Sequence, residues 1–130
     1  MIPQGTGGVI ITLGSVNGYR AFGGGLAHYT ASKHAIHGLT RALAVELGPH
    51  DIRVVAVAPT MVETEGVNAL RDVMGDSEFG AQLAAMAALH PAGRVCVPDD
   101  IARVVAFLVS DAAAMVNGTS IDVEGGYLSA

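Results

Sequence analysis

The 130-residue sequence has no tryptophan, one cysteine and one lysine, and only 15% of its residues are charged. The single cysteine, Cys96, excludes an internal disulfide and is typical of a reducing compartment, so we expect a cytoplasmic location. Seven basic residues stand against twelve acidic ones, and the net charge of −5 disfavours nucleic acid and anionic membrane surfaces as partners. No apolar run approaches bilayer-spanning length, so neither a membrane span nor a signal segment is predicted.

Small aliphatic residues and glycine dominate the chain instead. Hydrophobic residues make up 51% of the sequence, and there are 17 glycines. This composition suits strand–helix–strand units whose backbones approach closely, and it argues against a disordered segment. A piece of a larger buried core would show the same high apolar fraction.

Hydrophobic patterning predicts three strands. The β-branched run Gly7–Leu13 has no polar alternation, which predicts a strand buried on both faces. Two more strands are predicted at 52–57, which Pro59 stops, and at 119–123, after the turn Asn117-Gly118.

Helices are predicted between these strands. The longest covers 28–47, and a well-marked one begins at Pro98 with acidic residues in its first turn. Two weaker stretches lie at 67–74 and 78–89. The longest helix has apolar residues at helical spacing, namely Ile36, Leu39, Leu43 and Leu47. Crossovers of this length make neighbouring strands parallel, so the predicted fold class is α/β with about three parallel strands and crossover helices.

Three polar residues are expected at one edge of this sheet, where open parallel sheets bind their ligands. Ser15 follows the first strand and Thr64 follows the second. Tyr29 lies at the start of the long helix, which runs back antiparallel to the strands. The three side chains can therefore converge.

Tyr29 and Lys33 are four residues apart on a predicted helix and share a face. An ammonium beside a phenol lowers the phenol pKa from its ordinary value of about 10 and makes tyrosine a general acid/base. Ser15 can donate a hydrogen bond to a developing alkoxide. The same spacing also fits an ordinary surface pair of tyrosine and lysine.

The sequence around these residues resembles the short-chain dehydrogenase/reductase family. Ser15 followed by Tyr29-Thr30-Ala31-Ser32-Lys33 matches the serine and YxxxK motif of that family. The remaining matching segments occur in the family's order and cover essentially the whole chain: GGVIITLGS, YTASKHAIHGLTRALAVEL, IRVVAVAPTMVET, PDDIARVVAFLVSD and NGTSIDVEGGYL. The resemblance implies the C-terminal half of a doubly wound, Rossmann-type domain over residues 1–130, with a substrate lid at 65–90.

The same resemblance implies roles for individual residues. Tyr29 would donate and accept the proton, Ser15 would polarise the substrate oxygen, and Lys33 would hold the cofactor ribose. The implied cofactor-binding residues are Tyr29 and Lys33, together with four residues that match the segment lining the nicotinamide, namely Pro59, Thr60, Val62 and Thr64. The implied reaction transfers hydride between NAD or NADP and a secondary alcohol or ketone of 3-oxoacyl, steroid or polyol type. Helix 29–47 corresponds to a helix that packs against its own copy in relatives, which implies a homo-oligomer.

The sequence departs from the family pattern at three points. Thr60 stands where a glycine usually follows the proline, and the interval from Ser15 to Tyr29 is one residue longer. The glycine-rich TGxxxGxG turn that receives the pyrophosphate has no counterpart in these residues. We therefore expect weak or no NAD(P) binding by residues 1–130, and a non-catalytic fragment or oligomerisation module is the alternative interpretation.

Other candidate sites are weaker. His34 and His37 are three residues apart without an acidic or cysteine partner, so no metal site is predicted. We expect both histidines to face solvent or an interface. Cys96 lacks a histidine and aspartate constellation in sequence, and it is expected to be a small buried residue.

Overall fold

The computed structural model of the protein describes residues 1–129. Three strands form one parallel sheet in the order β1-β2-β3, and their bounds are β1 Gly8–Leu13, β2 Ile52–Pro59 and β3 Ser120–Val123. Gly8 pairs with Ile52 at the start of β1, and Val123 pairs with Pro59 at the end of β3. The predicted set of three parallel strands is confirmed.

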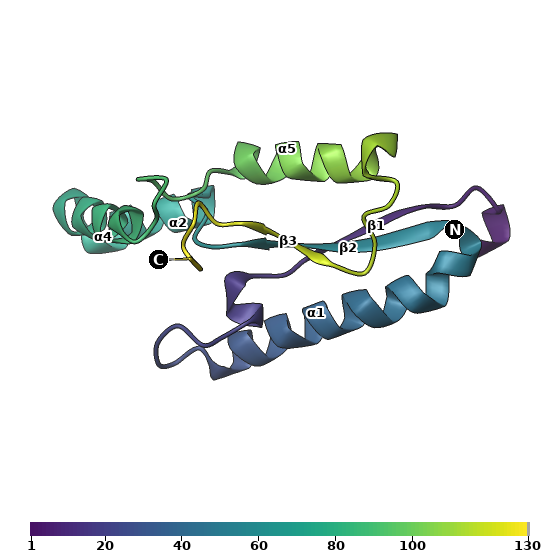
Figure 1. Ribbon diagram of the computed structural model, residues 1–130. Coiled ribbons are helices and arrows are strands. Elements are labelled where there is room, and N and C mark those ends of the chain that lie inside the picture. The colour runs from purple at the N-terminus through teal and green to yellow at the C-terminus, as the bar shows by residue number, and fades with distance from the viewer. Residues whose placement is uncertain (130) are drawn as a thin grey trace.

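Helices cover both faces of the sheet (Figure 1). One face carries α1 (Ala27–Leu47), the other carries α5 (Pro98–Val109), and three shorter helices lie beyond the carboxyl end of the strands. Their bounds are α2 Glu65–Asn68, α3 Leu70–Met74 and α4 Asp76–Ala88, so the predicted stretch 67–74 is divided in two. None of the helices in residues 1–129 is both long enough and apolar enough to cross a membrane.

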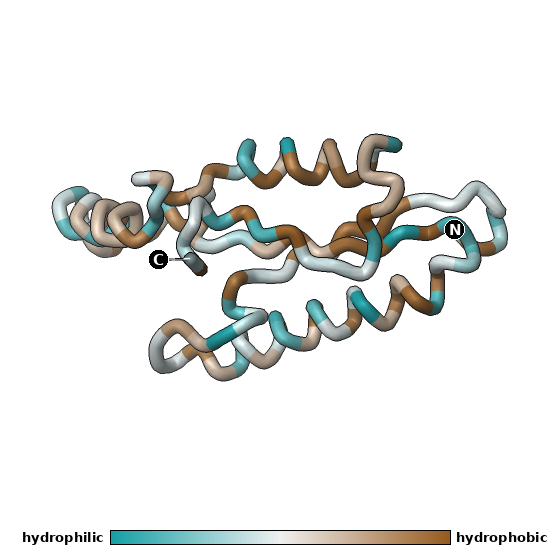
Figure 2. The backbone as a smooth tube through the Cα atoms, in the orientation of Figure 1, coloured by the Kyte–Doolittle hydropathy of each residue, from teal (hydrophilic) through white to brown (hydrophobic). Residues whose placement is uncertain are grey.

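Successive strand residues face opposite helices. Val55 and Val57 pack with Leu108 of α5, and all three side chains are fully buried. Thr12 of β1 points the other way, and its hydroxyl donates to the hydroxyl of Thr40 on α1 at 2.8 Å. Figure 2 shows α5 hydrophobic toward the sheet and hydrophilic on its outer side. The main apolar core therefore lies between α5 and the sheet.

Strand β1 is less buried than predicted. Its two end residues, Gly8 and Leu13, are exposed and the residues between them are half-buried, whereas β2 is buried along most of its length. The reason is position, because β1 is an edge strand of the described sheet and α1 packs mainly over β2. The prediction of burial on both faces is correct for β2 and wrong for β1.

The buried face of α1 also differs from the predicted apolar stripe. Leu39 is 48% exposed, and the buried residues of the helix are His37, Thr40 and Ala44. The expectation that His37 faces solvent or an interface is therefore wrong, while His34 is exposed as expected. His37 is buried because its ring fills the space that Gly14 and Gly18 leave open. A Cβ atom on either glycine would lie within 2.7 Å of that ring.

Burial of His37 predicts a pH-dependent stability. Burial lowers the pKa of His37 below its ordinary value of 6.5, and the positive charge of Arg41 lowers it further. Between these two pKa values the unfolded chain binds a proton that the native chain does not, so the free energy of unfolding falls as pH falls below 6.5. Urea denaturation at about pH 7.5 and about pH 5.5, on either side of the reference value, measures this loss. The His37→Gln variant should lose less stability over the same interval, and an equal loss would contradict the assignment to His37.

Candidate active site

Ser15 lies two residues after the end of β1 and is 4% exposed. Its Oγ accepts a hydrogen bond from the backbone N–H of Asn17 at 3.1 Å and so caps a short 3-10 turn. Tyr19, which follows this turn, donates from its phenol to Asp122 Oδ1 at 2.6 Å. Burial and the neighbouring carboxylate raise the pKa of Tyr19 to about 12, so this phenol stays protonated at neutral pH. The loop that carries Ser15 is thus tied to β3.

Tyr29 and Lys33 lie one turn apart at the start of α1. The Lys33 ammonium donates to the carbonyl of Leu13 at the end of β1, at 2.8 Å. The same Nζ atom lies 5.4 Å from the centre of the Tyr29 ring. The hydrogen bond to the strand backbone therefore holds a positive charge beside the phenol, and 38% of Tyr29 remains exposed.

A cleft of about 700 Å³ opens where β1 and β2 end, and we call it the strand-end cleft. Residues of α5, including Pro98, Ile101 and Val105, form an apolar wall on one side. Lys33 is the one charged residue among those that line the cleft in residues 1–129. All six residues predicted to contact a cofactor line it: Tyr29, Lys33, Pro59, Thr60, Val62 and Thr64.

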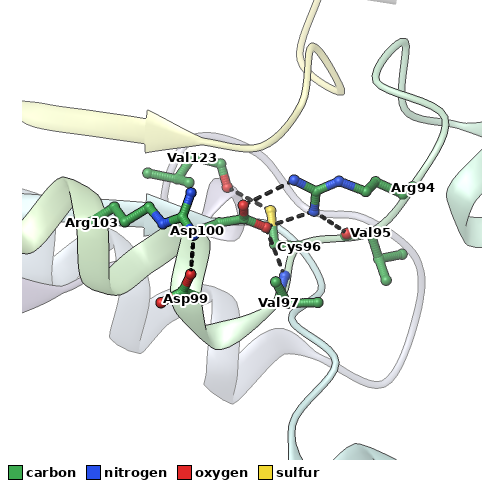
Figure 3. Close-up of polar contacts among 8 residues, drawn as sticks. All are labelled: Arg94, Val95, Cys96, Val97, Asp99, Asp100, Arg103 and Val123. Atoms are coloured by element: carbon green, nitrogen blue, oxygen red, sulfur yellow. Dashed lines mark hydrogen bonds and ion pairs between the residues drawn. The ribbon is translucent and has the colours of Figure 1, made fainter.

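A charged cluster holds the start of α5 against this cleft (Figure 3). The carboxylate of Asp100 accepts two hydrogen bonds from the Arg94 guanidinium, at 2.6 and 2.9 Å, and one from the backbone N–H of Val97 at 2.9 Å. These bonds hold the pKa of the Asp100 carboxyl well below its usual range. Asp100 therefore satisfies the N-terminus of α5, which fixes Pro98 and Ile101 at the cleft wall.

Cys96 is buried beside this cluster, as predicted, with 6% of its surface exposed. Its Sγ donates to the carbonyl of Val123 at 3.2 Å (Figure 3). Burial raises the pKa of the Cys96 thiol, so the residue is held as a thiol rather than as the reactive thiolate. No cluster of three or more histidine, cysteine or acidic side chains suited to a metal ion occurs within residues 1–129.

A second hollow, of about 310 Å³, contains Ser15 and Tyr29, and we call it the Ser15 cavity. No charged residue lines it within residues 1–129. Most of its wall was missed by the sequence reasoning, namely Val16, Asn17, Phe22, Leu26, Met61, Met86 and Tyr127. The sequence signal for these wall residues was weak. It consisted only of large side chains in loops at the carboxyl edge of the sheet, such as Phe22 near the triple glycine.

Tyr29 lies at the boundary between the two hollows, together with Thr60 and Met61, which also line both. Of the two hollows, Ser15 lines only the Ser15 cavity, and Lys33 lines only the strand-end cleft. The arrangement can place a small carbonyl compound against two hydroxyl groups, with a larger ligand beside it. The structure thus brings together all the residues that the sequence predicted for the site.

Comparison with known proteins identifies the family of the chain. The family model described as enoyl-(acyl carrier protein) reductase matches residues 1–128. The chain belongs to the short-chain dehydrogenase/reductase family.

Relatives in this family support the same assignment. The chain is 37% identical to carbonyl reductase [NADPH] 2 of Sus scrofa, over 99% of this chain and 50% of the relative. It is 38% identical to 2-dehydro-3-deoxy-D-gluconate 5-dehydrogenase of Escherichia coli K12, over 98% of this chain and 48% of that one. The chain spans about half the length of the curated relatives it matches.

A solved dehydrogenase structure shares the fold. It comes from Beutenbergia cavernae, is assigned as an NAD(P)-dependent gluconate 5-dehydrogenase, and holds NADP at low occupancy. The TM-score is 0.84 at 41% identity, over 100% of this chain and 49% of that chain. The prediction of half a doubly wound, parallel dinucleotide-binding fold is confirmed by this match.

Proposed function

We propose that this chain carries the proton-transfer and nicotinamide-side part of an NAD(P)-dependent oxidoreductase site, which interconverts a secondary alcohol and a ketone. One observation supports the proposal above all. Ser15 and Tyr29 share a small uncharged cavity, and Tyr29 and Lys33 share the larger cleft beside it.

In this proposal the Tyr29 phenol exchanges a proton with the substrate oxygen, and the Ser15 hydroxyl donates a hydrogen bond to the same oxygen. Lys33 contributes its positive charge, which stabilises the phenolate that forms when Tyr29 gives up its proton. The bond from Lys33 to the Leu13 carbonyl keeps that charge in place without a partner carboxylate. Tyr29 and Ser15 therefore act at the oxygen atom of the substrate, whereas Lys33 acts on Tyr29.

The residues of the strand-end cleft fit the nicotinamide end of NAD or NADP. Apolar side chains such as Ile101 and Val105 offer a surface for a planar ring, and Lys33 and Thr64 offer polar groups for the sugar and the carboxamide. When bound, the cofactor supplies hydride to the ketone or receives it from the alcohol. Because Lys33 is the one charged lining residue in the described part of the chain, little there would neutralise a pyrophosphate. This supports the expectation of weak binding.

The lining of the Ser15 cavity narrows the proposed substrate. A wall without charge, about 310 Å³ in volume, favours an uncharged molecule with a compact body. Phe22, Leu26 and Met86 supply apolar surface for that body. Of the three substrate types suggested by the sequence, ketones with an apolar body suit this lining better than polyols.

We also propose that α1 assembles with a second copy of itself. Leu39 and Val45 are 48% and 79% exposed on this helix, and Ala35 and Ala42 beside them are exposed as well. Small side chains let two helices approach closely, and the exposed apolar residues would be buried on contact. This proposal matches the homo-oligomer that the family resemblance implies.

Two measurements test the proposed oxidoreductase function. In a fluorescence titration with NADPH we expect binding weaker than the micromolar range, and a micromolar Kd would contradict the weak-binding expectation. At millimolar NADPH, on the order of the concentration that weak binding requires, we expect oxidation of the cofactor with an uncharged ketone. A matched keto acid of the same size should react more slowly, because the cavity has no cation to pair with a carboxylate. If no ketone reacts, the non-catalytic fragment is the better interpretation.

A further inference from the structure

His90 is a buried residue that neither the motifs nor the proposed reaction uses. It follows α4, and 3% of its surface is exposed. Its Nδ1 lies 2.7 Å from the carbonyl oxygen of Met86, and its Nε2 lies 2.7 Å from the hydroxyl of Thr60. A carbonyl oxygen only accepts, so the geometry assigns a proton to Nδ1, and in the neutral imidazole Nε2 is then the acceptor for the Thr60 O–H. Both ring nitrogens are thus satisfied.

The neighbours of His90 form part of the Ser15 cavity, although His90 does not line it. Thr60, at the end of β2, and Met86, on α4, are its hydrogen-bond partners and both line the cavity. Tyr127 near the C-terminus is a third lining residue, and its ring stacks on the imidazole with centres 4.9 Å apart. One buried side chain therefore connects three wall residues from three separate segments.

The C-terminal turn is seated closely against the residues that follow His90. The backbone N–H of Ala92 donates to the carbonyl of Gly125 at 3.0 Å. Gly126 adopts a φ of 89°, and a Cβ atom there would lie 2.8 Å from Pro91 Cγ. A side chain would displace the turn, so glycine is needed for Tyr127 to reach the imidazole.

We propose that His90 is a positioning residue, which fixes the shape of the Ser15 cavity and so selects the size of the ketone. This inference rests on the proposed function of that cavity. Without the imidazole, the Thr60 O–H loses its acceptor, the Met86 carbonyl keeps only its bond from the backbone N–H of Leu89, and Tyr127 loses the ring it stacks on. The three wall residues then loosen together. A looser cavity holds a compact ketone less well and admits a bulkier one.

The hydrogen bonds also fix the polarity of Thr60. Because its proton is donated to His90, its oxygen is left as an acceptor, and it accepts from the backbone N–H of Met61. The position of Thr60 after Pro59 suggests only that its side chain narrows the cleft. The structure gives Thr60 a second role. It connects the wall of the cavity to the imidazole.

The test compares His90→Leu with His34→Leu. His34 is exposed and makes the same kind of bond, from Nδ1 to the carbonyl of Thr30 four residues earlier, at 2.9 Å, but it lines neither hollow. In the full chain labelled with ¹³C-methyl methionine, His90→Leu should shift the Met61 and Met86 methyl resonances. The Met115 methyl, on a residue that is 95% exposed, should not shift. His34→Leu should move none of the three, and unchanged Met61 and Met86 signals in His90→Leu would overturn the proposal.

Kinetics supply the second readout. His90→Leu should raise KM for a compact ketone roughly tenfold, the cost of about one well-placed hydrogen bond, while kcat changes far less. His90→Gln, whose amide can reach Thr60, should recover part of the loss. If His90→Leu does not fold, Thr60→Val removes the same bond from the other side and should shift Met86 and raise KM in the same direction. Equal effects on kcat and KM, or none, would overturn the positioning role.

Failure of the proposed function looks different. If the wild-type chain turns over no ketone, or if Tyr29→Phe keeps its activity, the oxidoreductase assignment fails. The methionine resonances still report whether His90 holds the cavity wall, because they do not depend on turnover.

Discussion

Replacing Tyr29 with phenylalanine is expected to lower kcat for ketone reduction by about 10²- to 10⁴-fold, the contribution of a well-placed general acid. The substitution removes one oxygen atom and keeps the ring. The packing of Tyr29 between the two hollows and beside the Lys33 ammonium therefore remains. Because the phenol is the proposed proton source at the substrate oxygen, the loss should fall on kcat at saturating NADPH rather than on folding. Steady-state oxidation of NADPH measures it.

Tyr19→Phe is the matched control for this experiment. It makes the same chemical change in a tyrosine whose phenol is bonded to Asp122 and which lines neither hollow. The control should lower thermal stability, because it breaks the bond to β3, and leave kcat within about threefold of wild type, because the bond from the Asn17 N–H still holds Ser15. A Tyr29→Phe variant with the activity of Tyr19→Phe would contradict the assignment of Tyr29.

Leu108→Ala is expected to lower the free energy of unfolding by about 2–5 kcal/mol, the usual cost of emptying a leucine site in a packed core. Leu108 is fully buried on α5 against Val55 and Val57. Its backbone carbonyl also accepts a hydrogen bond from Arg53 at 2.8 Å, which holds the end of α5 in place. The surroundings can therefore collapse only partly around the lost methyl groups. Urea denaturation followed by circular dichroism measures the change.

Val109→Ala provides the comparison on the same helix. Val109 is the next residue along α5 and is 52% exposed, so its truncation should change the free energy of unfolding by less than about 0.5 kcal/mol. Both variants replace an aliphatic residue with alanine, and they differ mainly in burial. If the two variants were equally stable, the core between α5 and the sheet would not be packed as described.

The strands and helices could be predicted well from the sequence, because their signals are local. The β-branched runs predicted all three strands to within two residues at each end. The acidic first turn after Pro98 predicted α5. The structure explains this signal, because Asp100 accepts from the backbone N–H of Val97 and caps the helix. Burial was predicted less well. The apolar run of β1 resembles that of β2, yet β1 lies at the edge of the described sheet.

The candidate site shows the same division. Ser15, Tyr29 and Lys33 were predicted because a motif places them at one sheet edge, and the structure brings them together. The cavity wall could not be predicted, since residues such as Met86 and Tyr127 come from segments without a shared pattern. Their contact depends on the imidazole that lies between them and on a close glycine turn.

The sequence by itself determined the elements, the parallel sheet and the chemistry at its carboxyl edge, because each depends on local periodicity or on a short motif. Only the tertiary structure decided which partner covers each face. The strand order advances in one direction from β1 to β3, and α1 and α5 lie on opposite faces of the sheet (Figure 1). The crossover from β1 to β2 through α1 and the crossover from β2 to β3 through α5 therefore have opposite hands. One of the two departs from the right-handed rule for parallel strands. Burial of His37 and His90 was decided in the same way. The His90 ring is buried where its two nitrogens find partners, and the His37 ring is buried where Gly14 and Gly18 leave space for it.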